Sequence, residues 1–243
     1  VYAAAVISFV PSIGNYFVAD VLGGSGDRQA FLSDVLAAVG DRQHRERLDN
    51  ALRRRTFEVL PAGGLEERTR AMLKVQDGCV NFCSYCIIPY TRGPVRSMDM
   101  ETAVRQAEEL AARRYREIVI TGIEIASWGV DLPGKPGVAQ LIEAICKAVP
   151  GNRIRLGSLE PRIVTEDFCS RLSALPNLCP QFHLSMQSGC DSVLKRMNRR
   201  GDSAFLRDLL AKLRNRIPRL VIRTSLIAGL PGEGEEEFQE LLD

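Results

Sequence analysis

Five apolar segments alternate with amphipathic helical segments from about residue 70 onward, and this alternation is the strongest constraint on the fold. The expected strands are residues 71–77, 116–122, 153–159, 181–187 and 219–229. Strands separated by helices of this length pair in parallel through crossover connections, so the sequence predicts an α/β fold. An open doubly wound sheet and a full or partial barrel both satisfy the pattern.

The fourth expected strand, QFHLSMQ (181–187), favours the barrel. Its apolar face consists of Phe182, Leu184 and Met186, and its polar face of His183, Ser185 and Gln187. Because helices cover the outside of a parallel sheet, we expect the apolar face to point toward them. The polar face, together with Arg223 and Ser225 on the fifth strand, would then line a cavity for a polar ligand. A solvated face of an open sheet is the alternative.

The chain is predicted to contain two units. Residues 66–243 form a partial parallel (β/α) barrel, truncated before its last strand. Residues 1–62 are the tail of a small α/β amino-terminal domain, with a strand in 1–10 and a helix over 28–39. A Pro-Ala-Gly-Gly run at 61–64 suggests the boundary between them. The chain begins at Val1 and stops inside an expected helix, so we expect a fragment.

Composition and charge exclude several classes of protein. The formal net charge of +2 is too small to indicate nucleic-acid binding by itself. No segment reaches the apolar length of a membrane span, and the first ten residues lack the positive flank of a signal peptide. Seven cysteines, an odd number without regular spacing outside one cluster, fit a reducing cytoplasm. We therefore expect a cytoplasmic protein.

Three cysteines, Cys79, Cys83 and Cys86, directly follow the first expected strand. The C-x-x-x-C-x-x-C spacing brings three thiolates from one short loop to a soft metal centre. A closed zinc site has four ligands, so three thiolates leave one position open. We favour an iron–sulfur cluster with one free iron. Zinc with a fourth ligand from elsewhere in the chain and thioredoxin-like chemistry at Cys83 and Cys86 remain alternatives.

The cysteine loop and three further segments resemble the methylthiotransferases of the radical S-adenosylmethionine superfamily. The matching segments are GCVNFCSYCIIPYTRGPVRS, EIVITGIEIASWG, LSMQSGCDSVLKRMNRR and SLIAGLPGEGEEEF. The resemblance implies that Cys79, Cys83 and Cys86 hold a 4Fe-4S cluster whose fourth iron binds S-adenosylmethionine. Reductive cleavage of S-adenosylmethionine would release a 5′-deoxyadenosyl radical, which abstracts hydrogen from C2 of an adenine.

The resemblance also implies a substrate and partners. It is strongest to the branch that adds a methylthio group to C2 of N6-threonylcarbamoyladenosine at position 37 of tRNA. The implied partners are therefore the substrate tRNA and an electron donor such as flavodoxin. Siblings acting on isopentenyladenosine in tRNA or on a ribosomal-protein aspartate are the alternative, and a zinc-stabilised RNA-binding module is the alternative from another class. Family members bind a second, sulfur-donating 4Fe-4S cluster through three further cysteines. Residues 1–78 contain no cysteine, so we expect those ligands upstream of Val1.

Several residues outside the loop are implied contacts of S-adenosylmethionine. Gly122 ends the second strand at a turn that approaches the methionyl moiety, and Glu124 beside it could bond the amino group. Gln187 and Arg223 project toward the cofactor pocket from the fourth and fifth strands.

The turn of Gly229, Pro231 and Gly232 is suited to packing against adenine, because glycine permits close approach of the backbone. A plain strand-to-helix turn is the alternative. Arginines at 113–116 and 196–200 are expected to be surface charges on helices, and Cys146, Cys169, Cys179 and Cys190 to be small buried residues.

Overall fold

The computed structural model describes residues 50–62 and 69–242. The strand and helix expected within residues 1–39 lie outside these ranges. Among the described residues, no helix is both long enough and apolar enough to cross a membrane.

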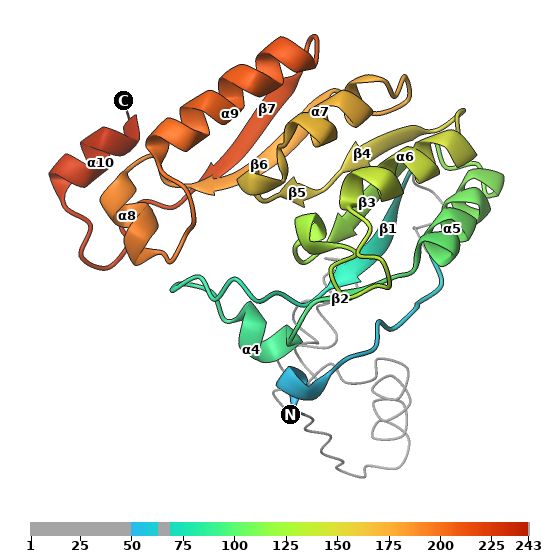
Figure 1. The fold of residues 1–243 in the computed structure, drawn as a ribbon, viewed down its shortest axis with the longest axis horizontal. Coiled ribbons are helices and arrows are strands. Elements are labelled where there is room, and N and C mark those ends of the chain that lie inside the picture. Colours follow the sequence, from blue (N-terminus) through green and yellow to red (C-terminus); the bar gives the residue numbers. More distant parts are fainter. Residues whose placement is uncertain (1–49, 63–68, 243) are drawn as a thin grey trace.

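The strands form a curled sheet that confirms the predicted partial parallel barrel (Figure 1). One part has the order β2-β1-β3-β4, formed by β2 (Arg96–Ser97), β1 (Arg70–Asp77), β3 (Glu117–Gly122) and β4 (Arg153–Leu156). The other has the order β5-β6-β7, formed by β5 (Ser158–Leu159), β6 (Gln181–Gln187) and β7 (Val221–Leu226). All pairs are parallel except β1 with β2.

One strand expected from the sequence, 153–159, is divided into β4 and β5 at Gly157. The amide of Gly157 still donates to the carbonyl of Ile120 in β3, at 2.8 Å. The two parts of the sheet are therefore consecutive along the chain and continue one another in space. The fifth expected strand is shorter than predicted, since β7 covers 221–226 instead of 219–229.

Four helices cover one face of the sheet: α5 (Met100–Ala112), α6 (Val138–Ala148), α7 (Glu166–Ser173) and α9 (Ser203–Arg216) (Figure 1). Two of them begin at side-chain caps. The Asp99 side chain accepts a hydrogen bond from the amide of Thr102 at 2.8 Å, and Thr165 accepts one from Phe168 at 3.2 Å. These side chains satisfy amides that the first helical turn leaves without partners.

Shorter helical segments connect the main elements. They are η2 (Ala51–Arg53), α4 (Ile88–Arg92), η3 (Ile125–Ser127), η4 (Pro161–Ile163), α8 (Asp191–Arg196) and α10 (Glu235–Leu242). Residues 50–62 lie against the barrel unit, because the Arg54 side chain donates to the carbonyl of Thr91 in α4 and Gln106 in α5 donates to the carbonyl of Leu60.

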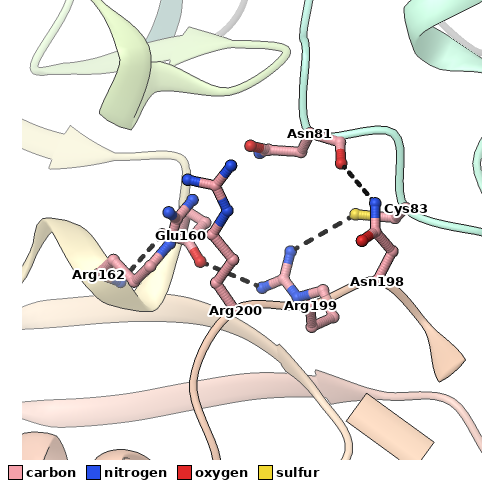
Figure 2. Close-up of a pocket in the computed structure, with 7 residues that line it drawn as sticks. All are labelled: Asn81, Cys83, Glu160, Arg162, Asn198, Arg199 and Arg200. Carbon is pink, nitrogen blue, oxygen red and sulfur yellow. Dashed lines mark hydrogen bonds and ion pairs between the residues drawn. The ribbon is translucent and has the colours of Figure 1, made fainter. Parts of the chain in front are cut away.

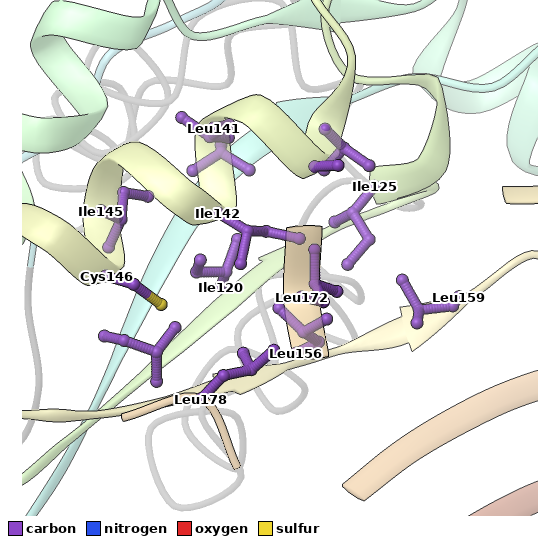
Figure 3. Packing of buried hydrophobic residues seen from close by; sticks show 14 of the residues in the cluster. Ile120, Ile125, Leu141, Ile142, Ile145, Cys146, Leu156, Leu159, Leu172 and Leu178 are labelled. Carbon is purple, nitrogen blue, oxygen red and sulfur yellow. The ribbon is translucent and has the colours of Figure 1, made fainter. Parts of the chain in front are cut away.

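The hydrophobic core lies between the sheet and the four covering helices α5, α6, α7 and α9 (Figure 3). Phe182 and Leu184 of β6 are completely buried in it, as the alternation in QFHLSMQ predicts. On the opposite face of the same strands, a ring nitrogen of His183 lies 3.0 Å from the Ser225 hydroxyl, and Arg223 is exposed. The four cysteines outside the loop are buried, also as expected.

Candidate functional site

The loop that carries the three clustered cysteines leaves the carboxyl end of β1 through a tight turn. Gly78 has a φ of 76°, and a Cβ at this position would lie 1.9 Å from the carbonyl oxygen of Pro94. Only glycine fits such a position. The next amide, of Cys79, donates to the carbonyl of Gly93 at 3.0 Å. The start of the loop is therefore fixed against the segment that follows α4.

A buried carboxylate anchors the same turn. Asp77 Oδ2 lies 2.6 Å from Lys74 Nζ, 3.4 Å from Arg92 Nη1 and 3.5 Å from Arg96 Nη2. Its other oxygen accepts a hydrogen bond from the amide of Gly78 at 2.8 Å. Burial by itself would raise the pKa of Asp77, but the three cations outweigh it and lower this pKa to about 2. The carboxylate thus stays ionised at neutral pH.

The three thiols of the loop are free and half-buried. Burial raises the pKa of the Cys79 thiol, and the nearby Glu124, Cys83 and Cys86 add to this effect. Among the described residues, no three His, Cys, Asp or Glu side chains are placed to hold a single metal ion. An iron–sulfur cluster binds each of its thiolates through a different iron. The donor set of three thiols on one loop fits such a cluster.

Gly122 and Glu124 lie beside the loop, at the carboxyl end of β3. A Cβ on Gly122 would lie 2.8 to 2.9 Å from atoms of Gln76, so glycine is required for this close approach. The Gln76 side chain accepts a hydrogen bond from the amide of Glu124 and donates to the carbonyls of Asp77 and Gly78. Gln76 therefore ties the turn after β3 to the start of the cysteine loop.

The Glu124 carboxyl group is poorly solvated. Burial raises its pKa to about 7, and the neighbouring carboxylate of Glu160 contributes. One oxygen accepts a hydrogen bond from the Ser127 hydroxyl. The other, Oε1, is buried and has no hydrogen-bond partner among the described residues. A buried acceptor without a partner is costly, and a hydrogen-bond donor of a bound ligand would satisfy it.

A polar pocket opens next to Cys83, formed by Asn81, Cys83, Glu160, Arg162, Asn198, Arg199 and Arg200 (Figure 2). The Arg199 guanidinium lies between an oxygen of Glu160 at 3.6 Å and the sulfur of Cys83 at 3.9 Å. Its Nη2 also donates to the carbonyl of Ser185 at 2.5 Å. Arg162 donates to the same Glu160 at 3.0 Å.

The expectation that arginines 196–200 are surface charges is wrong for Arg199. Its side chain is only 9% exposed, because it packs between Glu160 and the cysteine loop. Sequence reasoning also missed Glu160, which follows β5 and is 7% exposed in its side chain. Its position directly after an expected strand could have indicated a site residue, since the carboxyl ends of parallel strands meet at one edge of the sheet.

The other three predicted cofactor contacts lie in the second part of the sheet or in the turn that follows it. Gln187 ends β6 with a φ of 74°, and Arg223 is an exposed residue of β7. Gly229 is exposed and has a φ of 78°. The Glu233 carboxylate accepts hydrogen bonds from the amides of Gly229 and Leu230, which shapes the strand-to-helix turn before α10.

Residues 73–243 match the family model of the Radical SAM superfamily. Threonylcarbamoyladenosine tRNA methylthiotransferase MtaB of Bacillus subtilis (strain 168) is 37% identical over 222 residues, which cover 91% of this chain and 49% of the relative. Ribosomal protein uS12 methylthiotransferase RimO of Pelotomaculum thermopropionicum is 41% identical over 173 residues, covering 71% and 39%. The chain thus spans about half, or less, of the length of these relatives.

The fold is similar to that of a solved enzyme. The radical S-adenosylmethionine methyltransferase TsrM from Kitasatospora setae, solved with a tryptophan substrate and a SAM analog, has a TM-score of 0.58 and 17% sequence identity. The match covers 71% of this chain and 33% of that chain. At this identity the likeness concerns the fold alone.

Proposed function

Because the chain belongs to the radical SAM superfamily, we propose that it is the core of a methylthiotransferase that acts on C2 of N6-threonylcarbamoyladenosine at position 37 of tRNA. The family supplies a 4Fe-4S cluster and S-adenosylmethionine as cofactors. The observation that carries the proposal is the 37% identity to the Bacillus subtilis tRNA enzyme across 91% of this chain. Substrate tRNA is accordingly the proposed partner.

We assign the cluster to Cys79, Cys83 and Cys86. When bound, the cluster and S-adenosylmethionine supply the 5′-deoxyadenosyl radical. The chain's own contribution is to fix the loop, through Gly78, and to hold the three thiols at the carboxyl edge of the sheet. The Arg199 guanidinium lies 3.9 Å from the sulfur of Cys83, where its positive charge would offset negative charge of the assembled site.

The remaining assigned residues bind S-adenosylmethionine. Glu124 has an unsatisfied buried oxygen that can accept a hydrogen bond from the amino group, and the positive charge of that group would favour the carboxylate form. Gly122 leaves the backbone at the end of β3 free of a side chain. Gln187 and Arg223 are the proposed contacts in the second part of the sheet, and Gly229 is the proposed contact in the turn after β7.

Three finer features of the whole protein are part of the proposal. Residues 1–62 belong to an amino-terminal domain distinct from the barrel unit. The second, sulfur-donating cluster needs cysteines outside residues 1–78, and a longer protein would supply them. A reduced electron donor such as flavodoxin meets the protein in the cytoplasm.

Anaerobic reconstitution of the full-length gene product with iron and sulfide tests the cofactor assignment. The expected result is a broad visible absorption that dithionite bleaches, together with 5′-deoxyadenosine formation from S-adenosylmethionine. Tight stoichiometric zinc with neither signal would instead support the RNA-binding module. Mass spectrometry of nucleosides from treated tRNA then identifies the product, and absence of the methylthio derivative would refute the substrate assignment.

A ribosomal-protein substrate is the second candidate, because the RimO relative is 41% identical over 173 residues. The two are separated by giving the reconstituted protein tRNA and ribosomal protein uS12 in parallel reactions. A methylthio group on an aspartate of uS12, with unmodified tRNA, would favour this candidate.

A further inference from the structure

Two residues with left-handed backbones face each other across the candidate site. Phe82, in the middle of the cysteine loop, has a φ of 48°, and Asn198, after α8, has a φ of 56°. A left-handed conformation is unfavourable for phenylalanine, whereas asparagine adopts it readily. The loop therefore needs contacts from outside to hold Phe82 in this conformation.

The end of α8 explains the conformation of Asn198. The amide of Asn198 donates to the carbonyl of Lys195 at 3.1 Å, and the amide of Arg199 donates to the carbonyl of Leu194 at 2.9 Å. This pair of bonds is the Schellman arrangement, in which the residue after the helix is left-handed. The helix end thus fixes the backbone of Asn198 and leaves its side chain available for the cysteine loop.

That side chain bonds directly to the strained part of the loop. Asn198 Nδ2 donates to the carbonyl of Asn81 at 3.2 Å (Figure 2) and to the carbonyl of Phe82 at 2.9 Å. The amide of Ser84 donates in return to the carbonyl of Met197 at 3.1 Å. Three hydrogen bonds therefore join the segment between the first and third cysteines to a turn more than a hundred residues later in the chain.

The turn is itself anchored in the fold. The Met197 side chain is completely buried in a small apolar cluster with Cys190 and Val193, against which Leu230 packs. A hydrogen bond to an anchored partner can hold a loop, whereas one to a mobile side chain cannot.

We propose that Asn198 is a positioning residue: its carboxamide holds the backbone at residues 81–82, and with it Cys83, in place before any cofactor binds. Cluster assembly then finds the loop already ordered, which lowers the entropic cost of gathering its ligands. The role in cluster assembly rests on the proposed function, whereas the hydrogen bonds belong to the chain alone.

Hydrogen exchange of the metal-free protein tests the inference at the amide of Ser84. Asn198→Gly keeps the left-handed turn but removes the side chain, and it should speed exchange at Ser84 by about three- to tenfold. Asn198→Asp keeps the shape of the side chain but removes its donor, and it should have the same effect. Acceleration in both variants supports the proposal.

Arg114→Gly is the matched control. Arg114 has a φ of 64° and follows α5 in the same type of helix end, with the amide of Tyr115 bonded to the carbonyl of Leu110. This substitution should leave Ser84 exchange unchanged. Acceleration in Asn198→Gly but not in Asn198→Asp would mean that backbone freedom, not the donor, is responsible, and would overturn the proposal. So would unchanged exchange in both.

Reconstitution with iron and sulfide provides the second measurement. The Asn198 variants should assemble the visible chromophore more slowly than the parent protein, and Arg114→Gly at the parental rate. Failure of the parent to form any chromophore would count against the proposed function, while the exchange result would still decide the role of Asn198.

Discussion

Asp77→Asn is the substitution whose effect follows most directly from the structure. The change keeps the size of the side chain and removes its charge. The carboxylate is 8% exposed and lies next to Lys74, Arg92 and Arg96, of which both arginine side chains are 5% exposed. The variant would therefore leave several buried or half-buried positive charges with less compensation.

The magnitude follows from the pKa of Asp77. A decrease from 3.8 to about 2 corresponds to about 2 kcal/mol of stability at neutral pH. The pKa is lower in the folded state, so this stabilisation is complete above the unfolded-state value of 3.8 and disappears as the pH falls through about 2. In the variant, Arg92 and Arg96 would stay buried without the Asp77 charge, and this would increase the loss in the free energy of unfolding toward about 4 kcal/mol.

Urea unfolding at neutral pH measures the difference in the free energy of unfolding between parent and variant. Repeating it at decreasing pH should show the difference becoming smaller below about pH 4, because the parent carboxylate then loses its advantage. Asp167→Asn is the control, since Asp167 is 69% exposed and pairs with Arg171 at the surface. A loss in Asp77→Asn no greater than that of the control would refute the reasoning.

Three further outcomes are expected near the cysteine loop. Gly122→Ala should destabilise the fold by about 1–3 kcal/mol, measured by urea unfolding, because its Cβ would collide with Gln76; an unchanged midpoint would contradict this. The pKa of Glu124 rises from 4.5 to about 7 on folding, so ionisation of this carboxyl group destabilises the parent as the pH rises. The free energy of unfolding of Glu124→Gln, measured by urea unfolding, should therefore increase relative to that of the parent by up to about 3 kcal/mol between about pH 4 and pH 8. A pH-independent difference would disprove the burial of charge. Cys83→Ala should abolish 5′-deoxyadenosine formation and keep the parental circular dichroism spectrum, because the residue lies on a loop; persistent formation would exclude the assigned ligand.

The alternation of strands and helices could be read from the sequence because each element is defined by local periodicity. The apolar residues Phe182 and Leu184 of β6 lie in the core, as the alternation in QFHLSMQ predicts. The division of the strand at Gly157 was not predictable in this way, because it depends on where the sheet bends. The antiparallel strand β2 was also missed, since its two residues are too few to show a pattern.

The sequence by itself determined the three thiols and their spacing, because ligands in one short loop are close together in any fold. Only the tertiary structure decided what surrounds them. Arg199 looks like one more charge in a basic run, yet the fold buries it between Glu160 and the cysteine loop. Asn198 and Phe82 are 116 residues apart, and the fold joins them by a hydrogen bond. Contacts over such separations depend on how the strands and helices pack, and local periodicity carries no information about them.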